Sequence, residues 1–268
     1  MGTFHDCFRS IAAGDAMKRP LLEVSVEGVD GLIVSQENGA DRVELCASVL
    51  EGGITPSIGM VRQALRRATV PVFVIVRPRG GDFLYSEDEY ESMRQDIIAC
   101  REVGVPGVVT GCLTPDGQVD EQRTAELLQL ARPMGFTVHR AFDMVRDQDE
   151  ALEVLIRLGV DRVLTSGQCA TAVEGSGNLK RLGERAGERI IVMPCGSIRA
   201  GNIAQVIRET GLREFHFAGH AQQASGMTYR NSQIAMGGAS LDREYLKTVT
   251  DGEIVRTTVA AAMSVVGR

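Results

Sequence analysis

The chain alternates short apolar runs with longer amphipathic stretches. Most of the apolar runs are rich in Val, Ile or Leu at successive positions, which is typical of strands buried on both faces of a sheet. Strands are therefore expected at residues 21–26, 42–46, 72–77, 107–110, 136–140, 162–165, 190–193 and 214–218.

The stretches between these runs predict helices, because their apolar residues recur on one face. Several ends carry capping residues: Ser86 with Glu89 forms a capping box, and Asp147 with Glu150 resembles one. We also expect Asp120 and Asn202 to cap helices, Gly159 and Gly211 to end them, and a last helix over residues 251–266.

Eight strands, each followed by a helix, predict an α/β fold of the TIM (β/α)8 barrel type. A barrel of this kind uses roughly 250 residues, close to the 268 residues present. A flavodoxin-like sheet would need only about five strands and would leave the remaining units unexplained. We expect a single domain over residues 20–268, preceded by a loose tail at residues 1–19, because no linker-like stretch divides the chain.

Alternation along the strands places several polar side chains inside the barrel. Residues two apart share a face, so Glu23 lies with Ser25, and Arg42 with Glu44 and Cys46. The apolar residues between them must pack on the helices. We therefore expect a polar set to converge at the C-terminal mouth: Glu23, Glu44, Arg77, His139, Thr165 and His216.

Such a cluster is costly to bury unless its charges pair or meet a ligand. One interpretation is a structural ion-pair network that fills the barrel. The other is a binding site, because TIM-barrel sites lie at the C-terminal mouth. Polar, glycine-containing strand ends favour a site, and the expected ligand-binding residues are Arg77, Arg79, Asp82, Arg140, Asp143, Thr165, Ser166, Gly196 and His216.

The candidate catalytic residues are Glu23, Glu44 and His139. His139 is a candidate acid or base because histidine titrates near neutrality, and we expect Asp82, Asp143 or Glu44 to orient it. The forks of Arg77 and Arg79 suit a carboxylate or phosphate. Alternatively, a phosphate would bind backbone N–H groups at the turns containing Gly196-Ser197 and Ala218-Gly219. No lysine lies at a strand end, which disfavours Schiff-base chemistry.

The composition limits the classes of partner that the protein is expected to bind. The net charge is −6 and tryptophan is absent, so neither nucleic acid nor an anionic membrane is an expected partner. No apolar run is long enough to span a bilayer. The six cysteines form no CxxC pair, which indicates reduced thiols and a cytoplasmic protein.

Several motifs together resemble the CutC family, which is named for copper homeostasis. They are the run NGADRVELC at 38–46, and the segments at 51–57, 77–83, 139–143, 162–167 and 226–231. The resemblance covers about residues 21–250. It implies a TIM barrel, a cytoplasmic protein, self-association as a dimer or tetramer and, in some members, Cu(I) bound by two cysteines.

This sequence departs from the family pattern at the mouth. Animal-type members have a cysteine where this chain has Ser25, whereas Cys46 is retained. A Cu(I) site would then use Cys46, with Ser25 and Cys195 as further candidates. Cys195-Gly196-Ser197 stands where the family has a glycine run, and the residues after His216 also differ.

Three functions remain open from the sequence. The first is a CutC-like protein of copper homeostasis that binds Cu(I) through Cys46. The second is an enzyme that acts on a small carboxylate or phosphate substrate. The third is a non-catalytic structural barrel.

Overall fold

The computed structural model describes residues 19–236 and 243–266. Eight parallel strands form one sheet in the order β7-β6-β5-β4-β3-β2-β1-β8, and helices alternate with them, so the fold is a TIM barrel as predicted. The strands are β1 (Leu21–Glu27), β2 (Arg42–Cys46), β3 (Val72–Ile75), β4 (Gly107–Thr110), β5 (Gly135–Val138), β6 (Arg162–Thr165), β7 (Ile191–Pro194) and β8 (Glu214–Ala218).

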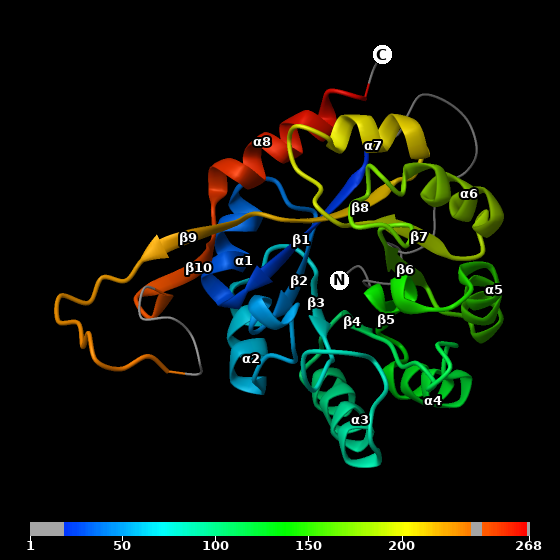
Figure 1. Ribbon diagram of the computed structural model, residues 1–268, viewed down its shortest axis with the longest axis horizontal. Helices are drawn as coiled ribbons and strands as arrows, with labels where there is room; N and C mark the ends of the chain where they lie inside the picture. The colour runs from blue at the N-terminus through cyan, green and yellow to red at the C-terminus, as the bar shows by residue number, and fades with distance from the viewer. Residues whose placement is uncertain (1–18, 237–242, 267–268) are drawn as a thin grey trace, which may run out of the picture.

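The helices lie outside the ring of strands (Figure 1). They are α1 (Gly28–Glu37), α2 (Ile58–Arg67), α3 (Glu87–Glu102), α4 (Glu121–Ala131), α5 (Gln148–Leu158), α6 (Ser176–Ala186), α7 (Ile203–Thr210) and α8 (Gly252–Met263). Strands β7 and β8 end the hydrogen-bonded order and come into contact as the sheet curls round. The barrel is therefore nearly closed.

The predicted alternation of side chains is confirmed. Leu22, Val24, Val43 and Leu45 belong to the large hydrophobic core between strands and helices. The intervening Glu23, Arg42 and Glu44 are also buried but lie outside that core. A second, small apolar cluster inside the barrel contains Leu164, Met193 and Cys195. The barrel interior is consequently polar over β1 and β2, whereas β6 contributes both the buried Arg162 and the apolar Leu164.

Some predicted ends differ from the structure. β3 stops at Ile75 and β5 at Val138, short of the expected Arg77 and Arg140, because the chain turns into the mouth loops there. Asp120 and Asp147 cap α4 and α5, and Ser86 forms its capping box with Glu89. The expected cap at Asn202 is wrong: its side chain accepts from the N–H of Arg199 and donates to the Ser197 carbonyl. Asn202 therefore fastens the turn before α7.

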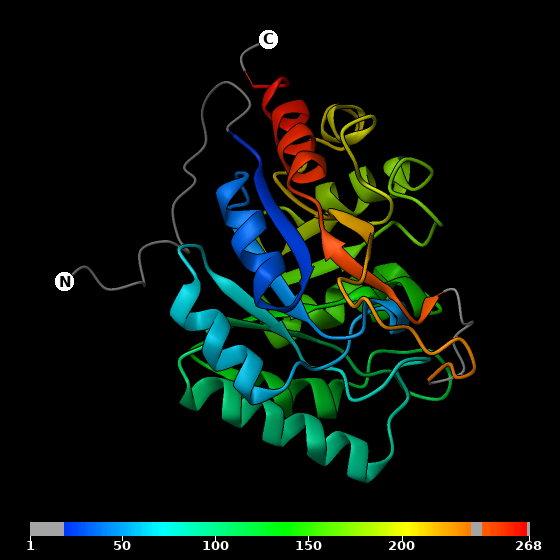
Figure 2. The same ribbon diagram turned by 90° about the vertical axis from the view of Figure 1, so that its left-hand side faces the viewer.

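The strand pattern did not predict a two-stranded ribbon after β8. Strands β9 (His220–Ala224) and β10 (Leu246–Thr250) pair antiparallel, and the ribbon projects from the barrel beyond α1 (Figures 1 and 2). Its strands are largely polar and exposed, so they lack the apolar run that marks the barrel strands. Of the tail expected at residues 1–19, only Arg19 lies in the described part, where it pairs with Asp41 at 2.8 Å.

Candidate functional site

Strands β1, β2 and β8 bring two acids and a histidine together. In the sheet register Glu23 lies beside His216, and Ser25 beside Glu44. The Nδ1 atom of His216 is 2.8 Å from Glu23 Oε1, and its Nε2 atom is 3.8 Å from Glu44 Oε2. Ser25 Oγ donates to Glu44 Oε2 at 3.2 Å. The expected convergence of Glu23, Glu44 and His216 is thus present, and His216 links the two carboxyl groups.

The two carboxyl groups titrate in opposite directions. Burial alone would raise the pKa of Glu23, but the charge of Arg42 and the hydrogen bond to His216 lower it well below its ordinary value. Burial raises the pKa of Glu44, and the nearby Glu23 charge adds to this. Burial would lower the pKa of His216, but the hydrogen bond to Glu23 and the Glu44 charge raise it. Glu23 is therefore an anion that favours a charged imidazole, and Glu44 retains a proton more readily.

A layer of buried ion pairs lies at the start of the strands, below this cluster. Arg42 pairs with Glu23 and, at 2.8 Å, with Glu214, which also pairs with Arg162 at 2.6 Å. Both guanidinium groups lie over the ring of Phe73, at 4.8 and 5.6 Å from its centre. A Cβ atom on Gly107 would lie 2.4 Å from that ring, so glycine makes room for it. The first interpretation of the sequence expected an ion-pair network inside the barrel, but the observed layer shares only Glu23 with the expected residues and forms only the floor of the barrel.

Above the floor, a cavity of about 270 Å³ opens between the ends of β1, β2 and β6–β8. Its polar lining includes Ser25, Cys46, Arg140, Cys195, Ser197, His216 and His220. The volume is slightly below the range of roughly 300–1,000 Å³ that is typical of ligand pockets. Two sequence-predicted site residues from opposite walls, Arg140 and His216, therefore face the same small cavity.

The two candidate metal-binding thiols line this cavity. Cys46 Sγ lies 3.8 Å from Ser25 Oγ and donates to the Val26 carbonyl at 3.2 Å. Burial raises the pKa of Cys46 to about 12, and burial raises that of Cys195 well above its ordinary value. Both thiols are consequently protonated at neutral pH. In the described residues, no three His, Cys, Asp or Glu side chains are grouped so as to hold a metal ion.

Arg77 and Arg79 hold loops together. Arg77 donates to the carbonyls of Glu51, Gly53 and Gly81 at 2.6–3.0 Å. Arg79 pairs with Glu89 at 2.6 Å and with Asp82 at 3.0 Å. Neither arginine, nor Asp82, lines the 270 Å³ cavity. Most of their donor groups already have protein acceptors. The geometry therefore gives little support to the prediction that the two arginines bind a carboxylate or phosphate.

His139 is also absent from the cavity lining. Its Nδ1 atom accepts from the N–H of Ala141 at 3.2 Å, and its ring lies 4.8 Å from that of Phe83. Burial, with the charge of Arg77, lowers its pKa to about 3, so the ring is neutral. The expectation that Asp82, Asp143 or Glu44 orients His139 is wrong, because the backbone of Ala141 does so. Phe83 and Ala141 were not part of the predicted site.

Polar residues that follow or end β5 and β6 form a hydrogen-bond network. The carboxylate of Asp143 accepts from Thr165 Oγ1 at 2.5 Å, from the backbone and side chain of Ser166, and from the N–H of Gln168. Arg140 donates from Nε to Asp143 and from Nη2 to Ser166 Oγ, each at 2.7 Å. The predicted residues Arg140, Asp143, Thr165 and Ser166 are thus together, and Asp143 positions the guanidinium of Arg140 at the cavity.

Sequence reasoning did not select His220, and it named Ser197 only as part of the Gly196-Ser197 turn. His220 begins β9 and lines the cavity from the ribbon, whose strands the apolar pattern did not predict. Ser197 follows Gly196 with a positive φ of 55°. The available signal for His220 was its position, two residues after the end of β8, at the mouth where TIM-barrel sites are built.

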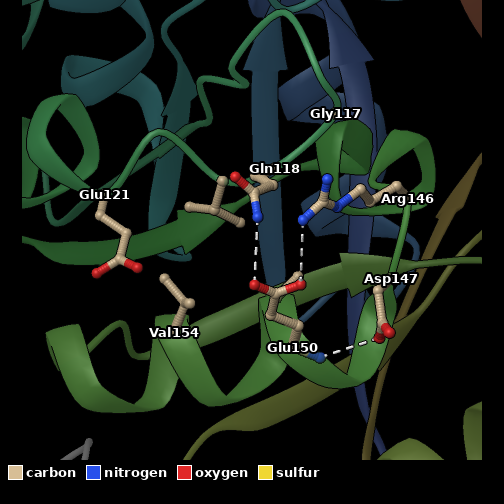
Figure 3. Close-up of a pocket in the computed structure, with 9 residues that line it drawn as sticks. Gly117, Gln118, Glu121, Arg146, Asp147, Glu150 and Val154 are labelled. Carbon is tan, nitrogen blue, oxygen red and sulfur yellow. Dashed lines mark hydrogen bonds and ion pairs between the residues drawn. The ribbon is translucent and has the colours of Figure 1, made fainter.

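A second hollow, of about 50 Å³, lies between the segment before α4 and the start of α5 (Figure 3). Its charges are satisfied locally: Glu150 accepts from Gln118 at 3.3 Å and pairs with Arg146 at 3.8 Å. None of the predicted site residues lines this hollow. The 270 Å³ cavity is therefore the candidate site.

Together, these elements define a parallel TIM barrel with a small, partly polar cavity at its C-terminal mouth. Residues 20–221 match the model of the CutC family, and the chain belongs to that family. A CutC family protein of Mesorhizobium japonicum is 59% identical, covering 91% of this chain and 94% of that protein. The human copper homeostasis protein cutC homolog is 45% identical, covering 91% and 90%.

Solved structures agree with this assignment. A CutC structure from Streptococcus agalactiae is 32% identical, covers 74% of this chain and 98% of that chain, and has a TM-score of 0.71. A thiamine phosphate pyrophosphorylase from Pyrococcus furiosus, at 16% identity, has a TM-score of 0.53, covers 94% and 99%, and shares the fold. Among the helices of residues 19–236 and 243–266, none has the length and apolar character needed to cross a membrane.

Proposed function

We propose that this CutC-family protein is an enzyme that transfers a proton on a small anionic substrate bound in the 270 Å³ cavity. The observation that carries the proposal is the Glu23–His216–Glu44 arrangement at its wall. Pairs of titratable groups whose surroundings push their pKa values apart are characteristic of acid–base sites. His216 lines the cavity, so it is the member of the cluster that meets the substrate.

Each member of the cluster has a distinct role in this proposal. Glu23 positions His216 and favours its imidazolium form, so His216 is the general acid. Glu44, beside the other ring nitrogen and hydrogen-bonded to Ser25, is the base: in its ionised form it takes a proton from His216, and the neutral imidazole then accepts the proton removed from the substrate. His139 has no catalytic role, because it is neutral, buried and absent from the cavity wall.

The test is solvent proton exchange on a panel of small carboxylates and phosphate esters in D2O, followed by proton NMR. We expect the wild-type protein to exchange a C–H proton of at least one compound. His216→Gln should abolish this exchange, and Glu44→Gln should slow it by about 100-fold or more. His139→Gln serves as the matched control and should retain it. Failure of every compound to exchange, or exchange that survives His216→Gln, would contradict the proposal.

A second candidate function, Cu(I) binding, is supported by two thiols that line one cavity and by the names of the relatives. Soft Cu(I) suits thiolate ligands, so we propose Cys46 with Cys195 as the donor pair. The fit is partial, because both thiols are protonated and the hydroxyl of Ser25 is a hard donor. Copper would have to displace both protons, and any copper held here is cargo.

Self-association and location are further proposals. On the segment between β9 and β10, exposed apolar side chains support a homo-oligomer: Met227, Tyr229, Ile234 and Met236. We propose the cytoplasm as the location, supported by five free cysteines in the described residues.

A further inference from the structure

The turn between β7 and α7 forms part of the cavity wall. Gly196, Ser197 and Ile198 line it in succession. Gly196 and Ser197 have φ angles of 96° and 55°. Neighbouring turn residues with positive φ can aim successive N–H groups into one concavity, which then binds anions. In the described part of the chain, the N–H groups of these three residues have no protein acceptor.

The turn is fixed in place by its neighbours. The Gly196 carbonyl accepts from the N–H of Ala172 at 2.9 Å, and the Asn202 amide binds the Ser197 carbonyl at 2.8 Å. A Cβ atom on Gly196 would lie 3.0 Å from that of Ser166, in addition to the strain of its positive φ. The three N–H groups are therefore held for a ligand before it arrives, which lowers the entropic cost of binding.

Arg140 supplies a cation at the same cavity. Its Nε and Nη2 atoms donate to Asp143 and Ser166, whereas Nη1 has no acceptor in the described residues. Because Asp143 neutralises part of this charge, the backbone donors and the imidazole of His216 across the cavity supply the remaining attraction for an anion. The donors that Arg77 and Arg79 were expected to provide are instead used on loop carbonyls and carboxylates.

We infer that the anionic end of the substrate is a phosphate group, held by the N–H groups of Gly196, Ser197 and Ile198 and by Arg140. Three neighbouring backbone donors and an arginine suit a tetrahedral dianion better than a planar carboxylate. The loops after the last strands are also where TIM barrels commonly bind phosphate. The inference rests on the proposed function, and it names the substrate class as small phosphate monoesters.

Titration of the 15N-labelled full-length protein with inorganic phosphate, sulfate and acetate tests this inference. We expect saturable amide shifts at Gly196, Ser197 and Ile198 with phosphate, weaker shifts with sulfate, and none with acetate. Absence of phosphate shifts at these residues, or equal saturation by acetate, would overturn the inference. This titration uses the wild-type protein, so its result does not depend on the folding of a variant.

A pair of variants separates the roles of the arginines. Arg140→Met should weaken phosphate binding about tenfold or more, which corresponds to about 1.4 kcal/mol. Arg79→Met makes the same change of charge at the mouth and should leave the affinity within about twofold. If Arg140→Met does not fold, Arg140→Lys keeps the charge but loses the fork, and should still weaken binding. An unchanged affinity in a folded Arg140 variant, or a larger loss for Arg79→Met, contradicts the inference.

The phosphate titration and the proton-exchange experiment can fail independently of each other. Phosphate binding that depends on Arg140, without exchange in any compound, would leave this subsite standing and remove the enzyme proposal. Exchange on carboxylates alone, with no amide shifts from phosphate, would leave the enzyme proposal standing and remove the phosphate subsite.

Discussion

The Nδ1 atom of His216 lies 2.8 Å from Oε1 of Glu23, although the two residues are 193 positions apart in the chain. The contact exists because β8 closes the barrel onto β1, with Glu23 and His216 as partners in the register. It joins the buried ion pairs of the barrel floor to the wall of the cavity. Glu23 is therefore both a structural carboxylate and a positioning residue for His216.

The two buried glutamates should differ in their contribution to stability. Glu23→Gln leaves Arg42 without its closest carboxylate and should lower the free energy of unfolding by about 3–5 kcal/mol. Burial and the Glu23 charge raise the pKa of Glu44, so its carboxylate is less stabilised by charge pairing, and Glu44→Gln should cost only about 1 kcal/mol. Urea denaturation monitored by circular dichroism measures both values. Equal losses would show that the two carboxyl groups are in the same charge state.

His139 should make stability fall as the pH is lowered. Its pKa is about 3 in the folded protein and 6.5 ordinarily, so the unfolded chain binds the proton more readily between these values. Stability is fully present above pH 6.5 and is lost towards pH 3. Between pH 6.5 and 5 the loss should be about 1.5 kcal/mol greater in the wild-type protein than in His139→Gln. Parallel stability profiles of the two proteins would disprove the neutral, buried state of His139.

Ser25→Cys should strengthen Cu(I) binding if copper enters the cavity. The 3.8 Å separation of Ser25 Oγ and Cys46 Sγ would then bring two soft donors together. We expect at least about a tenfold gain in affinity in an anaerobic titration against a Cu(I) chelator, and a loss with Cys46→Ala. Cys100→Ala, a buried thiol on α3 that does not line the cavity, is the matched control. Insensitivity to Cys46→Ala would exclude the proposed copper site.

Self-association should depend on the segment between β9 and β10. Tyr229 and Met236 are 73% and 69% exposed, so replacing both by Ser removes apolar area without disturbing the barrel core. We expect the wild-type protein to be an oligomer in light scattering after size exclusion, and the double variant to dissociate at about tenfold higher concentration. Ile191→Ser, at the opposite end of the barrel, should leave the assembly intact. A monomeric wild-type protein, or equal dissociation of the control, would contradict this role.

The prediction of the barrel from the sequence succeeded because its strands are short apolar runs, and on β1 and β2 polar residues occupy the interior positions. The same alternation correctly placed Glu23, Glu44 and His216 on interior faces. It did not predict the ribbon of β9 and β10, whose residues are mostly polar and none of which is fully buried, so they carry no burial signal. The alternation also could not predict which arginine reaches the cavity, because the groups that a long side chain contacts depend on loops that are distant in sequence.

The sequence by itself determined the class of fold and which side chains face inward, because both follow from local periodicity. Only the tertiary structure decided which charges pair. Arg42, and not Arg77, is the partner of Glu23, and Arg77 is occupied by loop carbonyls. Likewise His216, and not His139, reaches the cavity. The physical reason is that pairing depends on distances across the closed barrel, which no pattern along a single strand can specify.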